Sequence, residues 1–291
     1  MESRAFGATG LSVSVIGLGG GQIGEAWVSD TDAASVLNGA LDAGVTLVDT
    51  ARGYGSSEER IGRHLGHRRD EFTLSTKGGY DIEGTEDWTP DNLVQTIERA
   101  LRLLRTDRID IFHLHSCPAE VLARGELQDT LDDAVRAGKV VVAAYSGDND
   151  PLALAADSGR FGSVETSINL ADQWSLHEVL PRHPDLGVIA KRPLANAPWR
   201  FAERPTGHYA ELYWDRLRRL ALDPAGLDWD EFALRFTAYA PGVDCAITGT
   251  AQLANLQRNA TLVDRGPLPD DVLAAVAAAW DREGADWPGS V

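Results

Sequence analysis

The stretch VSVIGLGGGQIGEAWVSD, residues 13–30, decides between two folds. Its glycines Gly19, Gly21 and Gly24 match the pattern G-x-G-x-x-G, the dinucleotide-binding fingerprint of a Rossmann domain. In a Rossmann domain the glycine loop leads directly into a helix whose N-terminus meets the pyrophosphate. Here the first helix start signal comes only at Ser29-Asp30-Thr31-Asp32. The sequence therefore predicts a loop at the glycines and argues against a Rossmann domain.

Eight short β-rich runs alternate with helical patterns along the chain. The runs are 12–17, 45–50, 71–77, 109–115, 139–146, 163–169, 187–193 and 244–249. Helices are expected between them, with a capping box at Ser56–Glu59 and a Thr89-Pro90 start for a helix that carries Leu93, Ile97, Leu101 and Leu104 on one face. Strands that alternate with helices run parallel, and eight of them close into a barrel of about 250 residues.

The predicted fold is thus a single α/β domain over residues 1–291, a (β/α)₈ or TIM barrel. The remaining segments are an N-terminal hairpin (Arg4–Val13), a long loop after the seventh strand (194–228) and an extra C-terminal helix (269–281). No low-complexity tract or charge block divides the chain. We expect one hydrophobic core and one site at the mouth of the barrel.

Composition excludes several classes of function. The net charge is −17, with 27 Lys+Arg against 44 Asp+Glu, so binding to nucleic acid is not expected. The start of the chain, MESRAFGATG, lacks an apolar signal core, and no run is apolar over the roughly 18 residues that a membrane span needs. Cys117 and Cys245 are expected to be reduced thiols. The expectation is a cytoplasmic protein, either a monomer or a small homo-oligomer, that is not bound to a membrane.

Four chemically active side chains follow three consecutive strands. Asp49, Lys77 and His115 close their strands, and Tyr54 lies in the loop after the first of the three. Adjacent strands lie about 4.8 Å apart, so the four groups can converge at the barrel mouth. A tyrosine with an ordinary pKa near 10 donates a proton poorly, and a neighbouring ammonium is expected to lower that pKa. Such a tyrosine could protonate a carbonyl oxygen while Asp49 holds the lysine and His115 orients the substrate.

These residues resemble the aldo-keto reductase family. The resemblance runs from about Arg4 to Ala260 and rests on the segments Leu47–Ala51 with Tyr54–Glu58, Thr76-Lys77, Asp110–His115, Gly138-Lys139, Pro193-Leu194 and Gly249-Thr250 with Asn259. It implies that Asp49, Tyr54, Lys77 and His115 form a catalytic tetrad. It also implies NADPH, or less often NADH, bound across the barrel mouth without a Rossmann domain. Hydride would pass from the cofactor to a carbonyl carbon, giving an alcohol.

The resemblance also implies a set of cofactor contacts, and the chain departs from the family at some of them. Glu165 replaces a usual glutamine, Lys191 a frequent tyrosine, and Asn255 an arginine that recognises the 2′-phosphate of NADPH. Arg258 or Lys191-Arg192 could supply the missing cation, so NADPH is favoured and NADH stays open. The expected contacts are Gly20, Asp49, Ser146, Glu165, Lys191, Pro193, Leu194, Gly249, Thr250, Asn255, Arg258 and Asn259.

Aromatic residues in the loops predict an apolar or aromatic small-molecule carbonyl substrate. Trp27, Trp199 and Trp214 are expected to wall its pocket, with His113 as a packed or wall residue. His113 and His115 also form a His-x-His pair, as in metal hydrolases, but the ends of the later strands supply no further ligands, so no metal is expected.

Two alternatives to a carbonyl reductase remain. One is a cofactor-binding regulatory or redox-sensing subunit on the same scaffold, because a fold does not fix a function. The other is a metal-dependent hydrolase built on the His-x-His pair.

Overall fold

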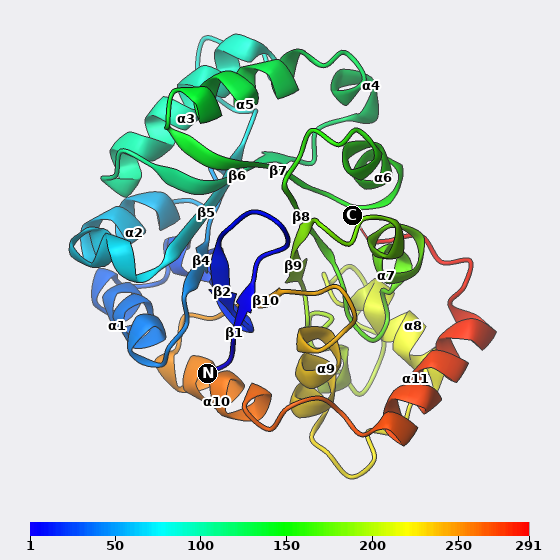
Figure 1. Cartoon of the computed structure of the whole chain (residues 1–291). Coiled ribbons are helices and arrows are strands. Elements are labelled where there is room, and N and C mark those ends of the chain that lie inside the picture. Colours follow the sequence, from blue (N-terminus) through cyan, green and yellow to red (C-terminus); the bar gives the residue numbers. More distant parts are fainter. Residues whose placement is uncertain (291) are drawn as a thin grey trace.

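The computed structural model describes residues 1–290, and its central element is a closed barrel of eight parallel strands (Figure 1). Around the barrel the strand order is β10-β3-β4-β5-β6-β7-β8-β9. Their bounds are β3 Ile16–Gly19, β4 Leu47–Asp49, β5 Thr73–Gly78, β6 Ile109–His115, β7 Val140–Ser146, β8 Ser163–Ser167, β9 Gly187–Lys191 and β10 Cys245–Gly249. The predicted (β/α)₈ barrel is confirmed.

Helices surround the barrel and cover its outer face (Figure 1). They are α1 Asp30–Asp42, α2 Ser57–Leu65, α3 Pro90–Leu104, α4 Ala119–Leu122, α5 Glu126–Arg136, α6 Asn149–Asp157, α7 Trp174–Glu178, α8 Glu211–Leu220, α9 Trp229–Ala238, α10 Leu253–Val263 and α11 Asp270–Glu283. Helix α3 begins as predicted, with Thr89 Oγ1 accepting a hydrogen bond from the backbone N–H of Asn92 at 3.3 Å. None of the helices within residues 1–290 is long and apolar enough to cross a membrane.

The N-terminal hairpin closes one end of the barrel. Strands β1 (Ser3–Ala5) and β2 (Ser12–Ser14) pair antiparallel and lie across the barrel opening that faces the viewer in Figure 1. The prediction of one strand over 12–17 is therefore wrong, because that run is shared between β2 and the barrel strand β3. The side chain of Val13 packs under the barrel with that of Phe6.

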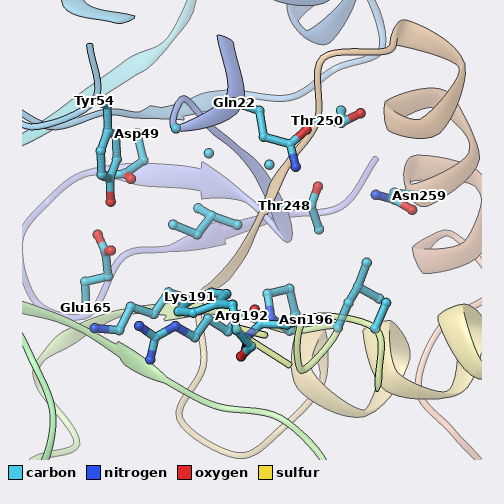
Figure 2. A pocket seen from close by; sticks show the side chains of 18 of the residues that line it. Gln22, Asp49, Tyr54, Glu165, Lys191, Arg192, Asn196, Thr248, Thr250 and Asn259 are labelled. Atoms are coloured by element: carbon cyan, nitrogen blue, oxygen red, sulfur yellow. Dashed lines mark hydrogen bonds between the residues drawn. The ribbon is translucent and has the colours of Figure 1, made fainter. Parts of the chain in front are cut away.

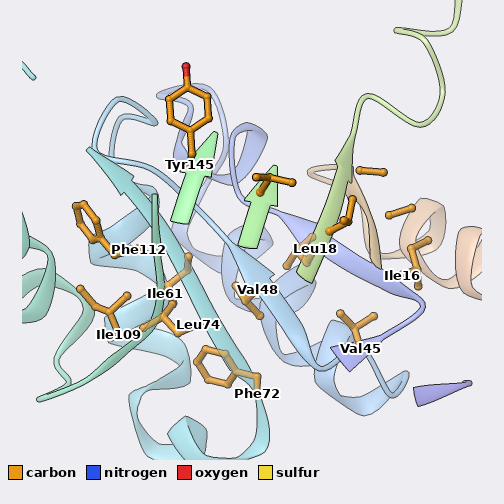
Figure 3. Close-up of a cluster of buried hydrophobic side chains, with 14 of the residues drawn as sticks. Ile16, Leu18, Val45, Val48, Ile61, Phe72, Leu74, Ile109, Phe112 and Tyr145 are labelled. Atoms are coloured by element: carbon orange, nitrogen blue, oxygen red, sulfur yellow. The ribbon is translucent and has the colours of Figure 1, made fainter. Parts of the chain in front are cut away.

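Side-chain alternation along the strands separates two layers. In β4, Leu47 belongs to the apolar cluster inside the barrel, whereas Val48 packs outward against the helices. Figure 3 shows part of the outer layer around Val48, Ile61 and Leu74. Asp49, two residues after Leu47, points inward again above the apolar cluster. The same alternation holds in β6, where Ile111 is followed on the inner face by His113 and His115. A polar layer therefore lies at the carboxyl ends of the strands.

Two local predictions are wrong. The segment 194–228 is not a plain loop, because it contains a short 3₁₀ turn, Pro198–Arg200, and helix α8, in which Tyr213, Arg216 and Leu220 are buried at helical spacing. The capping box at the start of α2 does not form. Ser56 Oγ instead donates to the carbonyl of Gly24 at 3.1 Å, which ties α2 to the glycine-rich loop.

Candidate active site

A cavity of about 760 Å³ opens at the carboxyl ends of the strands (Figure 2). Most of the predicted catalytic and cofactor-binding side chains line it. They are Asp49, Tyr54, His115, Ser146, Glu165, Lys191, Pro193, Leu194, Gly249, Thr250, Asn255, Arg258 and Asn259. Lys77 lies buried beneath this lining and is fully covered. The cavity lining and Lys77 beneath it thus bring together residues from all eight barrel strands.

Lys77 is the centre of the buried charges. Its Nζ donates to Asp49 Oδ2 at 2.5 Å and to the carbonyl of Thr50 at 3.0 Å, and lies 3.1 Å from Glu165 Oε2. All three charged side chains are at most 2% exposed. Burial alone would lower the pKa of Lys77, but the two carboxylates outweigh it and raise the pKa above its ordinary value. Lys77 therefore keeps its charge. We call Asp49, Lys77 and Glu165 the inner cluster.

Tyr54 lies beside the inner cluster, with its ring centroid 5.3 Å from Lys77 Nζ. In Figure 2 its hydroxyl points toward the carboxylate of Glu165. Lys77 exerts the largest single effect on the pKa of Tyr54 and lowers it, as expected from the sequence. Burial and the charges of Glu165 and Asp49 together outweigh this and raise the pKa to about 12. The expected net lowering is thus wrong for the chain alone, and Tyr54 holds its proton at neutral pH.

His115 stands edge-on to Tyr54, with ring centroids 6.1 Å apart and planes at 89°. Its Nδ1 shares a hydrogen bond of 2.9 Å with the hydroxyl of Tyr80. Burial and the nearby Lys77 lower the pKa of His115 to about 3, so the ring is neutral at pH 7. Sequence reasoning missed Tyr80, although its place three residues after Lys77 is a signal for a side chain at the same barrel mouth.

His113 lies under the cavity floor rather than in the cavity. It is fully buried, and its Nε2 is 3.1 Å from Ser75 Oγ, which in turn donates to Asp49 Oδ1 at 2.8 Å. Asp49, His113 and Glu165 place potential metal-ligand atoms within 4.8 Å of one another. The sequence analysis of strand ends did not find this group, because Glu165 lies inside β8. The ammonium of Lys77 contacts both carboxylates of this group, so a protein cation lies beside them and offsets one of their two charges.

The glycine-rich stretch has a packing role. It forms the end of β3 and a 3₁₀ turn, Gln22–Gly24, and α1 begins only at Asp30, as the sequence predicted. A Cβ on Gly24 would lie 1.8 Å from the carbonyl oxygen of Tyr54, and one on Gly20 would lie 2.8 Å from that of Asp49. Only glycine allows this backbone approach. Gly20 therefore supports the site from behind, while Gly19, Gly21 and Gln22 line the cavity.

A second group of charges lies at the other end of the cavity. Arg258 on α10 donates to Asp230 Oδ2 at 2.6 Å and to Asp228 Oδ2 at 3.3 Å. Trp199 Nε1 donates to the remaining oxygen of Asp230 at 3.0 Å, and Arg200 lies 3.7 Å from Asp230. We call Arg258, Asp230 and Asp228 the outer cluster. Sequence reasoning identified Arg258 but missed its acidic partners.

The tryptophans expected to wall a substrate pocket lie outside the cavity lining. Trp27 is 70% exposed in the loop after β3. Trp199 stacks on Trp229 with ring centroids 5.7 Å apart, and Trp214 donates its indole N–H to the carbonyl of Phe201 at 3.0 Å. These contacts hold the segment after β9 together. The cavity is lined instead by polar side chains. They include Arg192, which the sequence offered as a partner for a phosphate, and Asn196, Arg200 and His208, which the sequence analysis did not single out.

The cavity lining leaves polar atoms free for a ligand. Within residues 1–290, Ser146 Oγ and Thr248 Oγ1 are buried and have no hydrogen-bond partner. Buried polar groups are seldom left unpaired, so these two atoms fit a bound molecule with donors and acceptors of its own. The amide, hydroxyl and phosphate groups of a nicotinamide dinucleotide have that character.

Comparison with known proteins identifies the family. Residues 15–281 match the model of the aldo/keto reductase family. The chain is a member of this family. It is 24% identical to "Uncharacterized oxidoreductase YqkF" of Bacillus subtilis (strain 168) over 95% of each protein, and 28% identical to D-threo-aldose 1-dehydrogenase of Pseudomonas sp over 88% of this chain and 91% of that one. Aldo-keto reductase AKR11C1 from Bacillus halodurans, in its holo form, shares the fold with a TM-score of 0.83, at 22% identity and 96% coverage of both chains.

One further relative has a different kind of name. The chain is 26% identical to "Probable voltage-gated potassium channel subunit beta" of Arabidopsis thaliana, over 92% of this chain and 93% of that one. Family membership and the oxidoreductase relatives place this aldo/keto reductase among the oxidoreductases, in a family that generally uses NAD(P)H.

Proposed function

We propose that this aldo/keto reductase reduces an aldehyde or ketone to an alcohol with a nicotinamide cofactor. The observation that carries the proposal is the convergence of Tyr54, Lys77, Asp49 and His115 on one cavity. A bound NAD(P)H would supply the hydride. The four side chains would supply the proton and hold the carbonyl in place.

Tyr54 acts as the general acid in this proposal. Its proton is retained at neutral pH, so it is available to the carbonyl oxygen as negative charge develops there. Lys77 stabilises the phenolate that remains, and Asp49 fixes the ammonium at 2.5 Å. His115 is neutral, and the hydroxyl of Tyr80 holds its Nδ1, so its other nitrogen can face the carbonyl oxygen.

The cofactor would be held by Ser146 and Thr248, whose hydroxyls have no partner within residues 1–290, by the carboxylate of Glu165 and by the backbone around Gly249. The sequence favoured NADPH, but the outer cluster supports NADH. Arg258 is already paired with Asp230 and Asp228, and Asn255 cannot make the arginine fork that suits a phosphate. A carboxylate in this position would accept hydrogen bonds from ribose hydroxyls and repel a 2′-phosphate.

The lining supports a polar, hydroxylated carbonyl rather than the apolar one expected from the sequence. Asn196, Arg192, Arg200 and His208 offer donors to hydroxyl groups, whereas the tryptophans face elsewhere. The relative named D-threo-aldose 1-dehydrogenase, which is named for an aldose, is consistent with this class of substrate.

Titration with NADH and NADPH, followed by a carbonyl panel read at the nicotinamide absorbance, tests the proposal. The panel should contain hydroxyaldehydes and aromatic aldehydes. Tyr54→Phe is expected to lower kcat by roughly 10²- to 10⁴-fold while the Kd of the cofactor stays within about twofold. Full turnover by Tyr54→Phe would remove the phenol from the mechanism, and failure of both cofactors to bind would remove the reaction itself.

A regulatory subunit is the second candidate, supported by the match to the potassium channel subunit. It would bind the cofactor but turn over carbonyls negligibly. The same carbonyl panel separates the two candidates, since sustained turnover by the full chain excludes a purely regulatory role.

A further inference from the structure

Glu165 is the buried charge that the proposed proton transfer does not use. Its carboxylate is 2% exposed and lines the cavity between β7 and β9. Its Oε2 forms an ion pair with Lys77 Nζ at 3.1 Å. Burial works against the charge of Glu165, but Lys77 outweighs it and holds the pKa of Glu165 below its ordinary value. Glu165 is therefore an ionised carboxylate that faces the cavity.

The inner cluster holds more negative than positive charge. One ammonium, Lys77, faces two carboxylates, Asp49 and Glu165. The next lysine, Lys191, is not free to balance the second carboxylate because its Nζ pairs with Asp148 Oδ2 at 2.9 Å. The two histidines nearby are neutral, since burial lowers the pKa of His113 to about 4 and that of His115 to about 3.

Asp49 and Glu165 share this surplus unequally. Burial and the charge of Glu165 outweigh Lys77 and raise the pKa of Asp49 to about 7, so Asp49 is partly protonated at neutral pH while Glu165 keeps its charge. A low-dielectric site with an unbalanced carboxylate favours a bound cation. Glutamine, which the family usually carries at this position, has the same shape as glutamate and lacks the charge.

We propose that Glu165 makes the cavity bind the oxidised, cationic form of the nicotinamide cofactor more tightly than the reduced, neutral form. The inference rests on the proposed function, because it needs a nicotinamide cofactor in this cavity. The two forms share their ribose, pyrophosphate and adenine, so the ring charge is the difference that Glu165 can sense. With the cofactor bound, Glu165 would also favour carbonyl reduction, because its charge would stabilise the cationic oxidised form that remains once the cofactor has supplied a hydride and Tyr54 a proton.

The expected size of the effect of Glu165 on cofactor affinity follows from Coulomb's law. One unit charge acting over about 6–10 Å at an effective dielectric constant near 20 changes the affinity for a cation on the order of 10- to 100-fold. The full-length protein is therefore expected to bind NAD⁺ more tightly than NADH. Glu165→Gln should reduce the ratio of Kd(NADH) to Kd(NAD⁺) by about that factor, mainly through weaker binding of NAD⁺.

Asp230→Asn is the matched control. It makes the same acid-to-amide change within the same cavity, but in the outer cluster, where the two forms of the cofactor do not differ. It should change both Kd values by a similar factor and leave their ratio within about twofold. Isothermal titration calorimetry of the wild type and both variants with NAD⁺ and NADH measures all six constants without turnover.

The outcomes separate the two proposals. An unchanged ratio in a Glu165→Gln protein that still binds NADH would overturn the role of Glu165 and leave the proposed function standing. Tighter binding of NADH than of NAD⁺ by the wild type would also overturn the role of Glu165. This measurement needs no variant, so the test does not depend on the folding of Glu165→Gln. Binding of neither form by the wild type would overturn both proposals.

Discussion

The inner and outer clusters each join one basic side chain to two carboxylates, but they lie in different surroundings. Asp49, Lys77 and Glu165 are at most 2% exposed. In the outer cluster, Arg258 is 45% exposed and Asp228 79% exposed, whereas Asp230 is 15% exposed. Water and salt screen Arg258 and Asp228, whereas the inner charges act on one another and on Tyr54 with little screening. Under the proposed function, the same composition would serve two purposes, chemistry in the inner cluster and selection of the cofactor in the outer cluster.

The comparison implies different costs for removing a charge. A buried ion pair that loses one partner leaves an uncompensated charge, which costs about 3–5 kcal/mol of stability. An exposed pair contributes only about 0–1 kcal/mol, so its members can exchange partners with a ligand. Substitutions should accordingly have their largest effects in the inner cluster and the smallest at Asp228.

Lys77→Met tests the inner cluster most severely. It leaves Asp49 and Glu165 facing each other without the ammonium, so we expect a loss of about 3–5 kcal/mol in the free energy of unfolding and at least a 10³-fold loss of kcat/KM. Urea denaturation and carbonyl reduction measure the two effects. Lys139→Met is the control, because Lys139 pairs with Glu98 on the surface, where both are more than 40% exposed. Equal stability losses in the two variants would end the distinction between the clusters.

His113→Gln tests the burial of neutral groups beneath the inner cluster. Burial lowers the pKa of His113 to about 4, whereas an unfolded histidine titrates near 6.5. As the pH falls from 7 to 5, His113 binds a proton in the unfolded state but not in the native state. The native state is therefore destabilised by about 2 kcal/mol. The variant should lack this contribution.

Urea denaturation of both proteins at pH 7, 6 and 5 gives the difference between their pH slopes. The exposed His67 provides a matched His67→Gln control, which should keep the wild-type slope. Parallel slopes for wild type and His113→Gln would mean that His113 accepts a proton in the folded state.

The barrel and the positions of the inner residues could be predicted because they depend on local patterns. Side chains alternate between the two faces of a strand, so Asp49 points inward with Leu47, and His115 points inward with His113. The carboxyl ends of parallel strands then bring Asp49, Lys77 and His115 together. These inferences need only the sequence and the spacing of strands.

The pKa of Tyr54 and the outer cluster could not be predicted in the same way. The pKa depends on the sum of opposing effects from Lys77, Glu165, Asp49 and burial, and each effect depends on a distance. Asp230 lies in the first turn of α9 and Arg258 in α10, and no spacing rule states which side chains of two helices will meet. The sequence could not tell which aromatic residues line the cavity, because stacking on another loop residue and lining a pocket require the same composition.

Asp230→Asn sharpens the comparison at the outer cluster. Removing this carboxylate frees Arg258 for a phosphate, so we expect the affinity for NADPH to rise by about 10-fold relative to that for NADH. Fluorescence titration with the two reduced cofactors measures the change. A ratio that stays constant would show that neither Asp230 nor Arg258 reads the 2′ position of the ribose.

Asp228→Asn should give the smallest effect of the series. Asp228 also pairs with Arg258, but at 3.3 Å and with 79% of its side chain exposed, so solvent already screens most of its charge. We expect the ratio of NADPH to NADH affinity to change by less than threefold. The same titration at low and high salt tests the reason, since any effect of Asp228 should fade as salt rises. A response as large as that of Asp230→Asn would mean that the exposure of a side chain does not determine how strongly its charge acts on the cofactor. The contrast between the two clusters would then have to depend on their distances from the reacting groups alone.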